Sequence, residues 1–183
     1  MPVPPTLSVA DRAFFSRHRE TSDVGVLISM PRKSLISGYT VLTLSRRLED
    51  ENGSFAGVLA ADIPIETLTG TFYRALNVGP KGSADLVRID GTLLAREPVL
   101  PEQRGAPVVA KPASLMRLDE APAGIYRGTT HVENVERITG YRLLRTFPAI
   151  VSVSIAVEDA LAEWYEQVHE FAAFWSLCDR KST

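Results

Sequence analysis

The extended segments of this chain occur in two groups, with one helical stretch between them. The first group covers residues 24–30, 39–48 and 55–63, which are rich in Val, Ile, Leu and Thr and are separated by polar or glycine-bearing turns. Residues of these types favour strands on a half-buried sheet. We therefore predict an antiparallel meander in the first third of the chain.

Two helices are predicted on either side of this meander. Ser8 to Asp11 have the form of a capping box and start a short helix over about residues 9–19. A second helix is predicted over residues 65–77, because apolar residues recur there at the spacing of one helix face: Ile65, Leu68, Phe72 and Leu76. The second helix connects the two groups of extended segments.

The second group begins with a hairpin. Residues 84–89 and 92–96 flank Asp90-Gly91, which favours a two-residue turn because both central residues of such a turn have positive φ. The proline-rich residues 97–124 predict a long crossover without continuous regular structure. The remaining extended segments cover residues 126–132, 137–146 and 150–157. We predict an α+β chain with two antiparallel sheets.

The chain ends in a predicted helix over residues 158–177 with an apolar stripe: Leu161, Trp164, Val168, Phe171 and Trp175. Such a stripe packs either on the sheet or against a partner chain. We expect packing for Leu161 and Trp164 and partner contact for Phe171 and Trp175. A homodimer is therefore one expected arrangement.

Composition excludes several functions. A net charge of −2 gives no overall electrostatic reason to expect a nucleic-acid partner or an anionic membrane surface. The single cysteine, Cys178, excludes an internal disulfide and a multi-cysteine metal site. No apolar run reaches the roughly 18 residues that span a bilayer, and the start lacks the pattern of a signal peptide. We expect no metal ion and no cofactor.

Catalysis is not expected either. The sequence has no nucleophile elbow, no phosphate-binding loop and no paired-histidine motif, and it has no kinase or cyclase motif. We therefore predict no catalytic residues in this chain, and we expect any output activity to reside in another part of the full-length protein.

Four motifs, in this order, resemble the double Cache sensor family: residues 11–15 (DRAFF), 38–47 (GYTVLTLSRR), 50–59 (DENGSFAGVL) and 88–96 (RIDGTLLAR). Members of this family are extracytoplasmic sensor regions of bacterial histidine kinases, diguanylate cyclases and chemoreceptors, built from two PAS-like modules. Residues 137–142 and Phe147-Pro148 are similar to the end of the membrane-proximal module.

The resemblance implies a domain organisation. Residues 1–64 would form a membrane-distal Cache module that lacks its N-terminal helix and first strands, and 65–80 a connecting helix. Residues 81–157 would form the membrane-proximal module, and 158–183 a helix toward the membrane. The implied function is periplasmic sensing within an inner-membrane protein, with a signal passed to a kinase or cyclase domain outside this chain. The alternative is a PAS-like interaction or dimerisation module without a small-molecule ligand.

The resemblance also implies a site. Family members that bind amino acids share an Arg-x-aromatic-aromatic helix end, a tyrosine with an acid, and an aspartate that closes the last strand. The first and last of these are matched by Arg12, Phe14, Phe15 and Asp62. A guanidinium holds a carboxylate through two parallel hydrogen bonds, and an aspartate pairs with an ammonium group. The tyrosine and acid are replaced by Arg32 and Ser34.

This replacement removes an anion and adds a cation, which shifts the predicted preference from an amino acid toward a plain carboxylate. We therefore predict a small organic acid held by Arg12 and Arg32, with Tyr39 and Asp62 lining the site. The alternative is that Arg12 pairs with Asp11 or binds a carbonyl group, and that Arg32 is a solvated loop residue.

Other candidates have simpler interpretations beside their functional ones. His18 is either a pH sensor or a helix-terminal residue. The pair Arg46-Arg47 is either an anion site or strand-edge charge. A second pocket in the later module would have three candidate wall residues, which otherwise serve packing and solubility: Tyr126, Tyr141 and Arg142.

Overall fold

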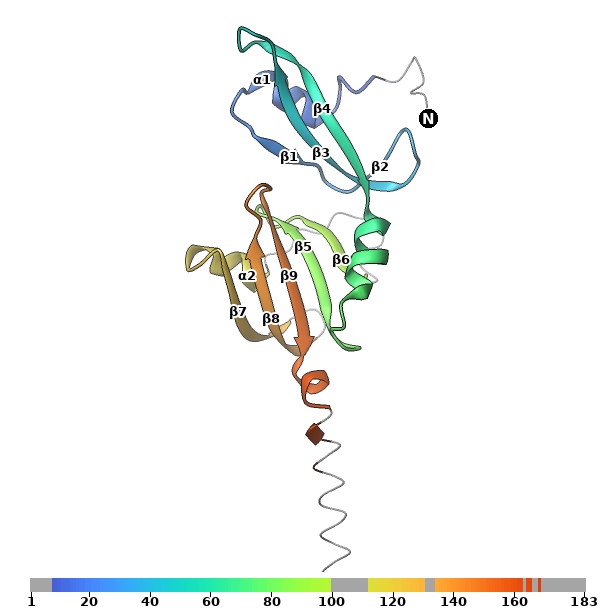
Figure 1. The fold of residues 1–183 in the computed structure, drawn as a ribbon, viewed down its shortest axis with the longest axis vertical. Coiled ribbons are helices and arrows are strands. Elements are labelled where there is room, and N and C mark those ends of the chain that lie inside the picture. The colour runs from blue at the N-terminus through green and yellow to red at the C-terminus, as the bar shows by residue number, and fades with distance from the viewer. Residues whose placement is uncertain (1–7, 100–111, 131–133, 163, 166–167, 169–183) are drawn as a thin grey trace, which may run out of the picture.

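The computed structural model describes residues 8–99, 112–130, 134–162, 164–165 and 168. These residues form two antiparallel sheets that follow one another along the long axis of the molecule, with a helical connection between them (Figure 1). The prediction of an α+β fold with antiparallel sheets is confirmed.

The first sheet is built on a long hairpin of β3 (Thr40–Glu49) and β4 (Phe55–Pro64). Both β1 (Val26–Ile28) and β2 (Arg32–Lys33) pair antiparallel with β3. The predicted meander is confirmed in β1, β3 and β4. The short strand β2 was not predicted, because two basic residues after a proline carry no strand periodicity.

One helix, α1 (Ala13–Glu20), lies on one face of this sheet and begins later than predicted. Its N-cap is Arg12, whose backbone is extended and whose N–H donates to the Val9 carbonyl oxygen at 3.0 Å. The chain therefore turns before the helix, and Ser8 does not cap it.

A buried histidine holds α1 on the sheet. His18 has no exposed surface, and its Nε2 lies 3.1 Å from the Ser45 hydroxyl on β3. Arg47 donates to the His18 carbonyl oxygen and lies over the Phe55 ring, 5.1 Å from its centroid. Phe15 packs edge-on against the same ring at 5.6 Å. His18 and Arg47 therefore anchor α1, beyond the helix-end and strand-edge roles expected for them.

The connection after β4 is helical, as predicted, but only residues 65–66 are α-helical. They continue into the π-helix η1 (Thr67–Phe72) and the 3-10 helix η2 (Tyr73–Ala75). Threonine and glycine have low α-helix propensity, and they occupy four of the six residues of η1. This connecting helix covers part of one face of the second sheet, where Tyr73 packs with Ala84 and Ala95.

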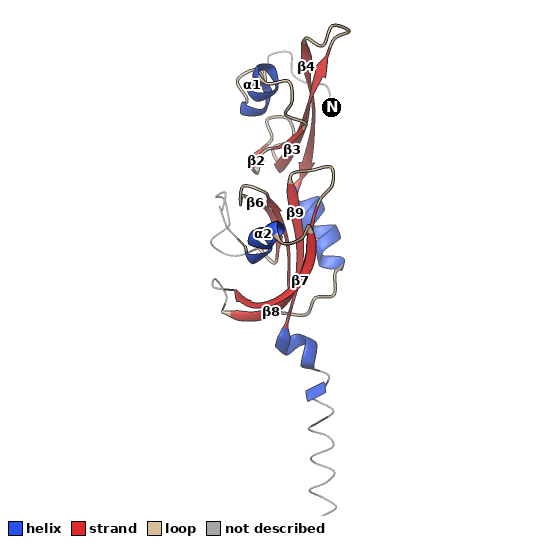
Figure 2. Cartoon of the chain, turned by 90° about the vertical axis from the view of Figure 1, so that its left-hand side faces the viewer, coloured by secondary structure: helices blue, strands red, loops and turns tan. Residues whose placement is uncertain are grey.

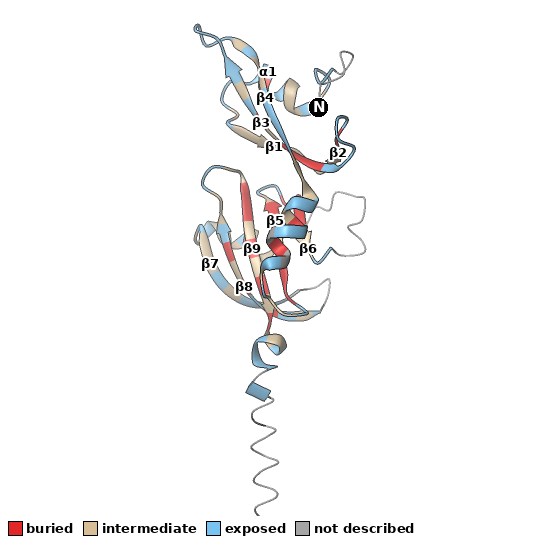
Figure 3. Ribbon diagram, turned by 45° about the vertical axis from the view of Figure 1, so that its right-hand side comes forward, coloured by how far each residue is buried: buried red, intermediate tan, exposed pale blue. Residues whose placement is uncertain are grey.

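The second sheet has the order β6-β5-β9-β8-β7. Its strands are β5 (Ser83–Arg88), β6 (Leu93–Glu97), β7 (Ala123–Thr130), β8 (Val135–Leu143) and β9 (Ala149–Ala156). Two short helices, α2 (Ala113–Met116) and η4 (Arg117–Asp119), belong to the crossover. They lie on the face opposite the connecting helix (Figure 2). Buried residues gather in this sheet and where β3 approaches it (Figure 3).

The turn between β5 and β6 differs from the prediction. Ile89, Asp90 and Gly91 form a three-residue loop closed by the Arg88 N–H, which donates to the Thr92 carbonyl oxygen at 2.8 Å. Gly91 has a φ of 91°, whereas Asp90 does not have a positive φ. The prediction of a two-residue turn is therefore wrong. The Asp90 carboxylate accepts the Thr92 N–H at 3.0 Å and so stabilises the longer loop.

The two sheets share one apolar cluster at their junction. Ile28 and Leu42 of the first sheet pack with Leu94 and Ala149 of the second, and each of these side chains is at most 6% exposed. Leu144 and Phe147, in the loop between β8 and β9, pack against this cluster. The sheets are therefore in direct contact as well as joined by the connecting helix.

The final helix follows β9 directly. Residues 157–162, 164–165 and 168 are helical, and the helix leads away from the second sheet. The expected packing of Leu161 and Trp164 on the sheet is wrong, since their exposed fractions are 38% and 55%. Phe171 and Trp175 lie outside the described residues. Within the described part of the chain, no helix has the length and hydropathy to cross a membrane.

Candidate ligand site on the first sheet

A polar cluster of four side chains lies on the α1-covered face of the first sheet: Arg32, Ser34, Thr43 and Asp62. Thr43 and Asp62 are opposite each other in the β3–β4 register. The Thr43 hydroxyl donates to Asp62 Oδ1 at 2.6 Å, and the Ser34 hydroxyl donates to Oδ2 at 3.0 Å. The two hydroxyl groups therefore fix the carboxylate on both oxygens.

Arg32 reaches this carboxylate from β2. Its Nη2 donates to the Thr43 hydroxyl at 2.9 Å and lies 3.5 Å from Asp62 Oδ1. Its Nε atom is buried and has no hydrogen-bond partner in the described structure. The guanidinium thus forms an ion pair with Asp62 while part of its donor capacity is unused.

The cluster is open to solvent on one side. The Arg32 and Asp62 side chains are 25% and 30% exposed, whereas Thr43 is 1% exposed and Ser34 5%. A carboxylate can accept up to about four hydrogen bonds, so Asp62 keeps acceptor capacity beyond its two hydroxyl donors. The cluster therefore presents one positive and one negative group, side by side, on a rigid base of hydroxyl groups.

The structure brings together three of the predicted site residues, which are Arg32, Ser34 and Asp62. Tyr39 is 62% exposed and does not enclose the cluster. Phe15 contacts Phe55, which lies seven strand positions from Asp62 on β4 and therefore roughly 20 Å away. The structure does not bring Phe15 to the polar cluster.

Arg12 and Phe14 are half-buried at the start of α1. In the described structure the Arg12 side chain makes no hydrogen bond or ion pair, and it does not cap the helix. It therefore does not pair with Asp11. Arg32 is a strand residue bound to Thr43 and Asp62, so its interpretation as a solvated loop residue is wrong.

Sequence reasoning missed Thr43, the residue that touches both charged groups. A threonine in a strand is normally explained by β-propensity alone. The available signal was the alternation in β3, where Thr43 and Ser45 share one face and Leu42 and Leu44 the other. Two buried hydroxyl residues on one face indicate polar partners on that face.

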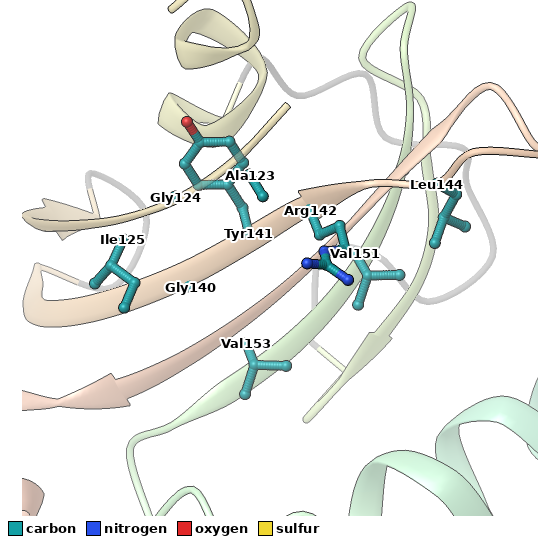
Figure 4. Close-up of a pocket in the computed structure, with 9 residues that line it drawn as sticks. All are labelled: Ala123, Gly124, Ile125, Gly140, Tyr141, Arg142, Leu144, Val151 and Val153. Carbon is teal, nitrogen blue, oxygen red and sulfur yellow. The ribbon is translucent and has the colours of Figure 1, made fainter. Parts of the chain in front are cut away.

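A second concave surface lies on the second sheet, beside the connecting helix. It is an open groove of about 710 Å³ (Figure 4) lined by Ala123, Gly124, Ile125, Gly140, Tyr141, Arg142, Leu144, Val151 and Val153. Tyr141 points away from it toward the crossover, where its hydroxyl oxygen lies 3.3 Å from the Arg117 carbonyl oxygen and 3.4 Å from that of Ala121, and shares its one proton between them. Arg142 is the one charged residue among the described residues that line the groove, so these residues include no acid that could bind an ammonium group.

A buried ion pair lies on the other face of the second sheet. Arg96 donates to Asp85 at 2.6 Å, and the two side chains are 12% and 13% exposed. Burial raises the pKa of the Asp85 carboxyl, while Arg96 and the Ser83 hydroxyl act in the opposite direction. Burial, together with Asp85, raises the pKa of Tyr73 to about 12. Little of this pair is accessible to a ligand.

Comparison with known proteins defines the class of this chain. Residues 68–154 match dCache_1_like, a family described as a histidine kinase sensor domain. The chain is 30% identical to the extracellular domain of rpHK1S-Z16, a protein classed as a histidine kinase, over 88% of this chain and 67% of that one, with a TM-score of 0.66. The fold and these matches are those of a sensor domain. The chain belongs to the dCache family of histidine kinase sensor domains.

More distant structures share the fold. The ligand-binding domain of the Pseudomonas fluorescens chemoreceptor CtaA, solved with L-alanine, is 18% identical with a TM-score of 0.53, over 87% of this chain and 66% of that one. That of the Pseudomonas aeruginosa PAO1 chemoreceptor PctB, solved with L-Arg, is 20% identical with a TM-score of 0.58, over 88% and 66%. The chain spans about two thirds of the length of the solved domains described here. No curated protein matches its sequence.

The family assignment decides the class of activity. The matched family consists of sensor domains, which are not enzymes, so this chain is a sensor domain. These matches name histidine kinases and chemoreceptors. A link to a diguanylate cyclase stays a prediction.

Proposed function

We propose that this chain binds a small α-amino acid outside the cytoplasmic membrane and passes a conformational signal to an output domain that lies outside the chain. In this proposal residues 1–64 form the membrane-distal module, residues 81–157 form the membrane-proximal module, and the full-length protein resides in the inner membrane. The ligand site is the polar cluster of the first sheet.

The pairing of Arg32 with Asp62 carries the proposal. An α-amino acid has a carboxylate next to an ammonium group, which matches a guanidinium next to a carboxylate. The Nη1 group of Arg32, for which the described structure has no hydrogen bond, would bind the ligand carboxylate, and Asp62 would accept the ammonium protons. Thr43 holds both charged groups in place and Ser34 holds Asp62, so little conformational entropy is lost on binding.

The same pairing changes the charge balance used in the sequence prediction. A plain carboxylate is favoured if Arg32 counts as an additional cation, but Asp62 neutralises Arg32 at 3.5 Å. A ligand with both charges keeps this balance, whereas a plain carboxylate adds a second negative charge beside Asp62 and brings no cation of its own. Arg12 stays a predicted second contact for the ligand carboxylate.

A thermal-shift screen of the twenty L-amino acids tests the proposal. We expect at least one to raise the melting temperature of the chain, since a ligand that binds only the folded state stabilises it. Asp62→Asn should abolish the shift. Glu66→Gln is the matched control, because it removes the same charge from an exposed residue just after β4 and should retain the shift.

Two results would overturn the proposal. One is that no amino acid raises the melting temperature of the chain. The other is that the shift persists in Asp62→Asn. The first would favour the interaction or dimerisation module.

A further inference from the structure

One side chain of the second sheet hydrogen-bonds to the backbone of the first. Arg88, the last residue of β5, donates from Nη1 to the carbonyl oxygen of Ile28, the last residue of β1, at 2.7 Å. The contact lies beside the apolar junction cluster that contains Ile28. Arg88 therefore contacts the first sheet at a point fixed by packing on both sides.

The Arg88 guanidinium is held in place by its own turn. Its Nε lies 3.0 Å from each Asp90 carboxylate oxygen, and its Nη2 donates to Asp90 at 2.6 Å and to the Thr92 hydroxyl at 3.1 Å. These hydrogen bonds keep the pKa of Asp90 well below its usual range. A guanidinium fixed by these bonds presents a rigid donor to Ile28, and a displacement of that carbonyl breaks the bond or moves the turn.

Ile28 is one residue from the backbone contacts of the ligand cluster. The Ser29 N–H donates to the Thr43 carbonyl oxygen, and the Ser29 hydroxyl accepts the Thr43 N–H, both at 2.9 Å. Thr43 is the residue that touches both Arg32 and Asp62. A change in the position of Thr43 would therefore reach the end of β1 through these two hydrogen bonds, one to the backbone and one to the side chain of Ser29.

On its other side, Arg88 adjoins the strand that leads to the final helix. Arg88 is paired with Ala149, the first residue of β9, and the next residue, Ile89, donates its N–H to the Pro148 carbonyl oxygen at 3.0 Å. Strand β9 ends at Ala156, and the helix begins at the next residue. A movement of the Arg88 turn therefore acts on the start of a strand whose far end is the helix.

We propose that Arg88 couples the polar cluster of the first sheet to β9 and the final helix, through its hydrogen bond to Ile28. This inference rests on the proposed ligand site. The coupled element has two arrangements, one with the Arg88–Ile28 bond made and one with it broken. A ligand shifts the balance between them in proportion to its unequal affinity for the two.

A double-mutant cycle tests this coupling without any ligand. Thr43→Val perturbs the cluster, Arg88→Met removes the junction bond, and hydrogen exchange of the β9 amides is the measurement. We expect Thr43→Val to change these exchange rates by at least about fivefold when Arg88 is present, the lower end of typical allosteric coupling. In the Arg88→Met background the effect of Thr43→Val should fall below about twofold, the range of independent sites.

Arg127→Met is the matched control. Arg127 is an arginine of the same sheet that pairs with Glu136 and is 61% exposed, so its loss should leave the response of β9 to Thr43→Val unchanged. Asp90→Asn is the second variant, for the case in which Arg88→Met does not fold. It keeps the guanidinium but loosens it, and should reduce the response. The coupling is overturned if Thr43→Val changes the β9 exchange rates as much in the Arg88→Met background as in the wild type. If Arg88→Met does not fold, the same result in the Asp90→Asn background overturns it. Loss of the β9 response in Arg127→Met overturns it as well.

A second arm separates this inference from the proposed ligand. L-alanine is used as the probe, and exchange is measured in β4 and in β9. Protection of β4 and β9 in the wild type, with protection of β4 alone in Arg88→Met, supports the coupling. Equal protection of β9 in both chains overturns the coupling and leaves the site intact. If the mutant cycle shows coupling but the chain binds none of the twenty amino acids, the coupling is supported and the proposed ligand is wrong.

Discussion

The two sheets each carry an arginine–aspartate pair, and the pairs differ in accessibility. In the first sheet Arg32 lies 3.5 Å from Asp62, and their side chains are 25% and 30% exposed. In the second sheet Arg96 lies 2.6 Å from Asp85, and their side chains are 12% and 13% exposed. The same two residue types thus form an open, longer pair in one sheet and a closed, shorter pair in the other.

This difference assigns the pairs different roles. Loss of one partner of a buried ion pair removes much of the compensation for the other buried charge, so the second-sheet pair is tied to folding. A partly exposed pair contributes little to stability but retains accessible donors and acceptors for a ligand. Accessibility, more than residue identity, therefore separates the candidate site from the core.

The largest effect on stability is expected when the buried ion pair of Arg96 and Asp85 is broken. Asp85→Ala should lower the free energy of unfolding by about 3 kcal/mol, because Arg96 would stay buried without this partner. Asp62→Ala is the matched variant in the open pair and should lower it by less than about 1 kcal/mol. Urea unfolding followed by circular dichroism measures both. Equal losses in the two variants would contradict the assigned roles.

The next largest effect is on ligand affinity and is tested by substituting two buried threonines, one in each sheet. Thr43→Val removes the hydroxyl between Arg32 and Asp62 and should weaken amino-acid binding about tenfold, by about 1.4 kcal/mol. Thr139→Val removes a hydroxyl that lies 2.9 Å from that of Ser154 in the second sheet, and it should lower stability but leave affinity unchanged. Calorimetric titration and urea unfolding measure the two quantities. An affinity loss in Thr139→Val would instead place the ligand site in the second sheet.

A smaller, pH-dependent effect concerns the junction pair of Arg88 and Asp90. The Asp90 pKa in the folded chain lies below its value in the unfolded chain, about 3.9, mainly because Arg88 donates to the carboxylate. Its stabilisation is therefore present at neutral pH and is lost as the pH falls below about 4 toward the folded pKa. The size stays below about 1 kcal/mol, since Asp90 is 53% exposed.

The measurement for this pair is the difference in unfolding free energy between the wild type and Asp90→Asn as a function of pH. We expect the wild type to be the more stable chain at neutral pH and the difference to narrow in acid. A difference that is constant with pH would show that the Asp90 charge does not stabilise the junction.

The smallest effect on stability is expected from alanine substitutions of two glycines on opposite faces of the second sheet. A Cβ atom added at Gly140 meets nothing within 4 Å, whereas one added at Gly124 would lie 3.0 Å from the Tyr141 hydroxyl oxygen. Gly140→Ala should stabilise the chain by about 0.5 kcal/mol, because alanine loses less conformational entropy in a strand. Gly124→Ala should be the less stable of the two variants, measured by thermal unfolding. The reverse order would mean that the open groove is filled.

Strands and the charged residues of the candidate site could be predicted from the sequence more readily than contacts between distant segments. The alternation in β3 and the turn before β4 specify a hairpin, and the resemblance placed Asp62 at the end of its second strand. Thr43 was missed because its role depends on Arg32, which approaches from a strand too short to be periodic. The role of Arg88 depends on a contact with Ile28 across the junction between the sheets, and no local pattern encodes that contact.

Helix ends and packing partners were less predictable for a related reason. The capping pattern at Ser8 is local, but α1 is positioned by His18 and Ser45 on a strand further along the chain. A histidine with no exposed surface cannot be distinguished by sequence from one at a helix end. Burial of this kind is decided by the sheet that forms beneath the helix.

Isothermal titration calorimetry with L-alanine and propionate tests the central claim most directly, because the two compounds differ mainly in the ammonium group. We predict that L-alanine binds the wild-type chain at least about tenfold more tightly than propionate, and that Asp62→Asn removes this difference. Equal or tighter binding of propionate by the wild type would contradict the account, since Asp62 would then not recognise a cation.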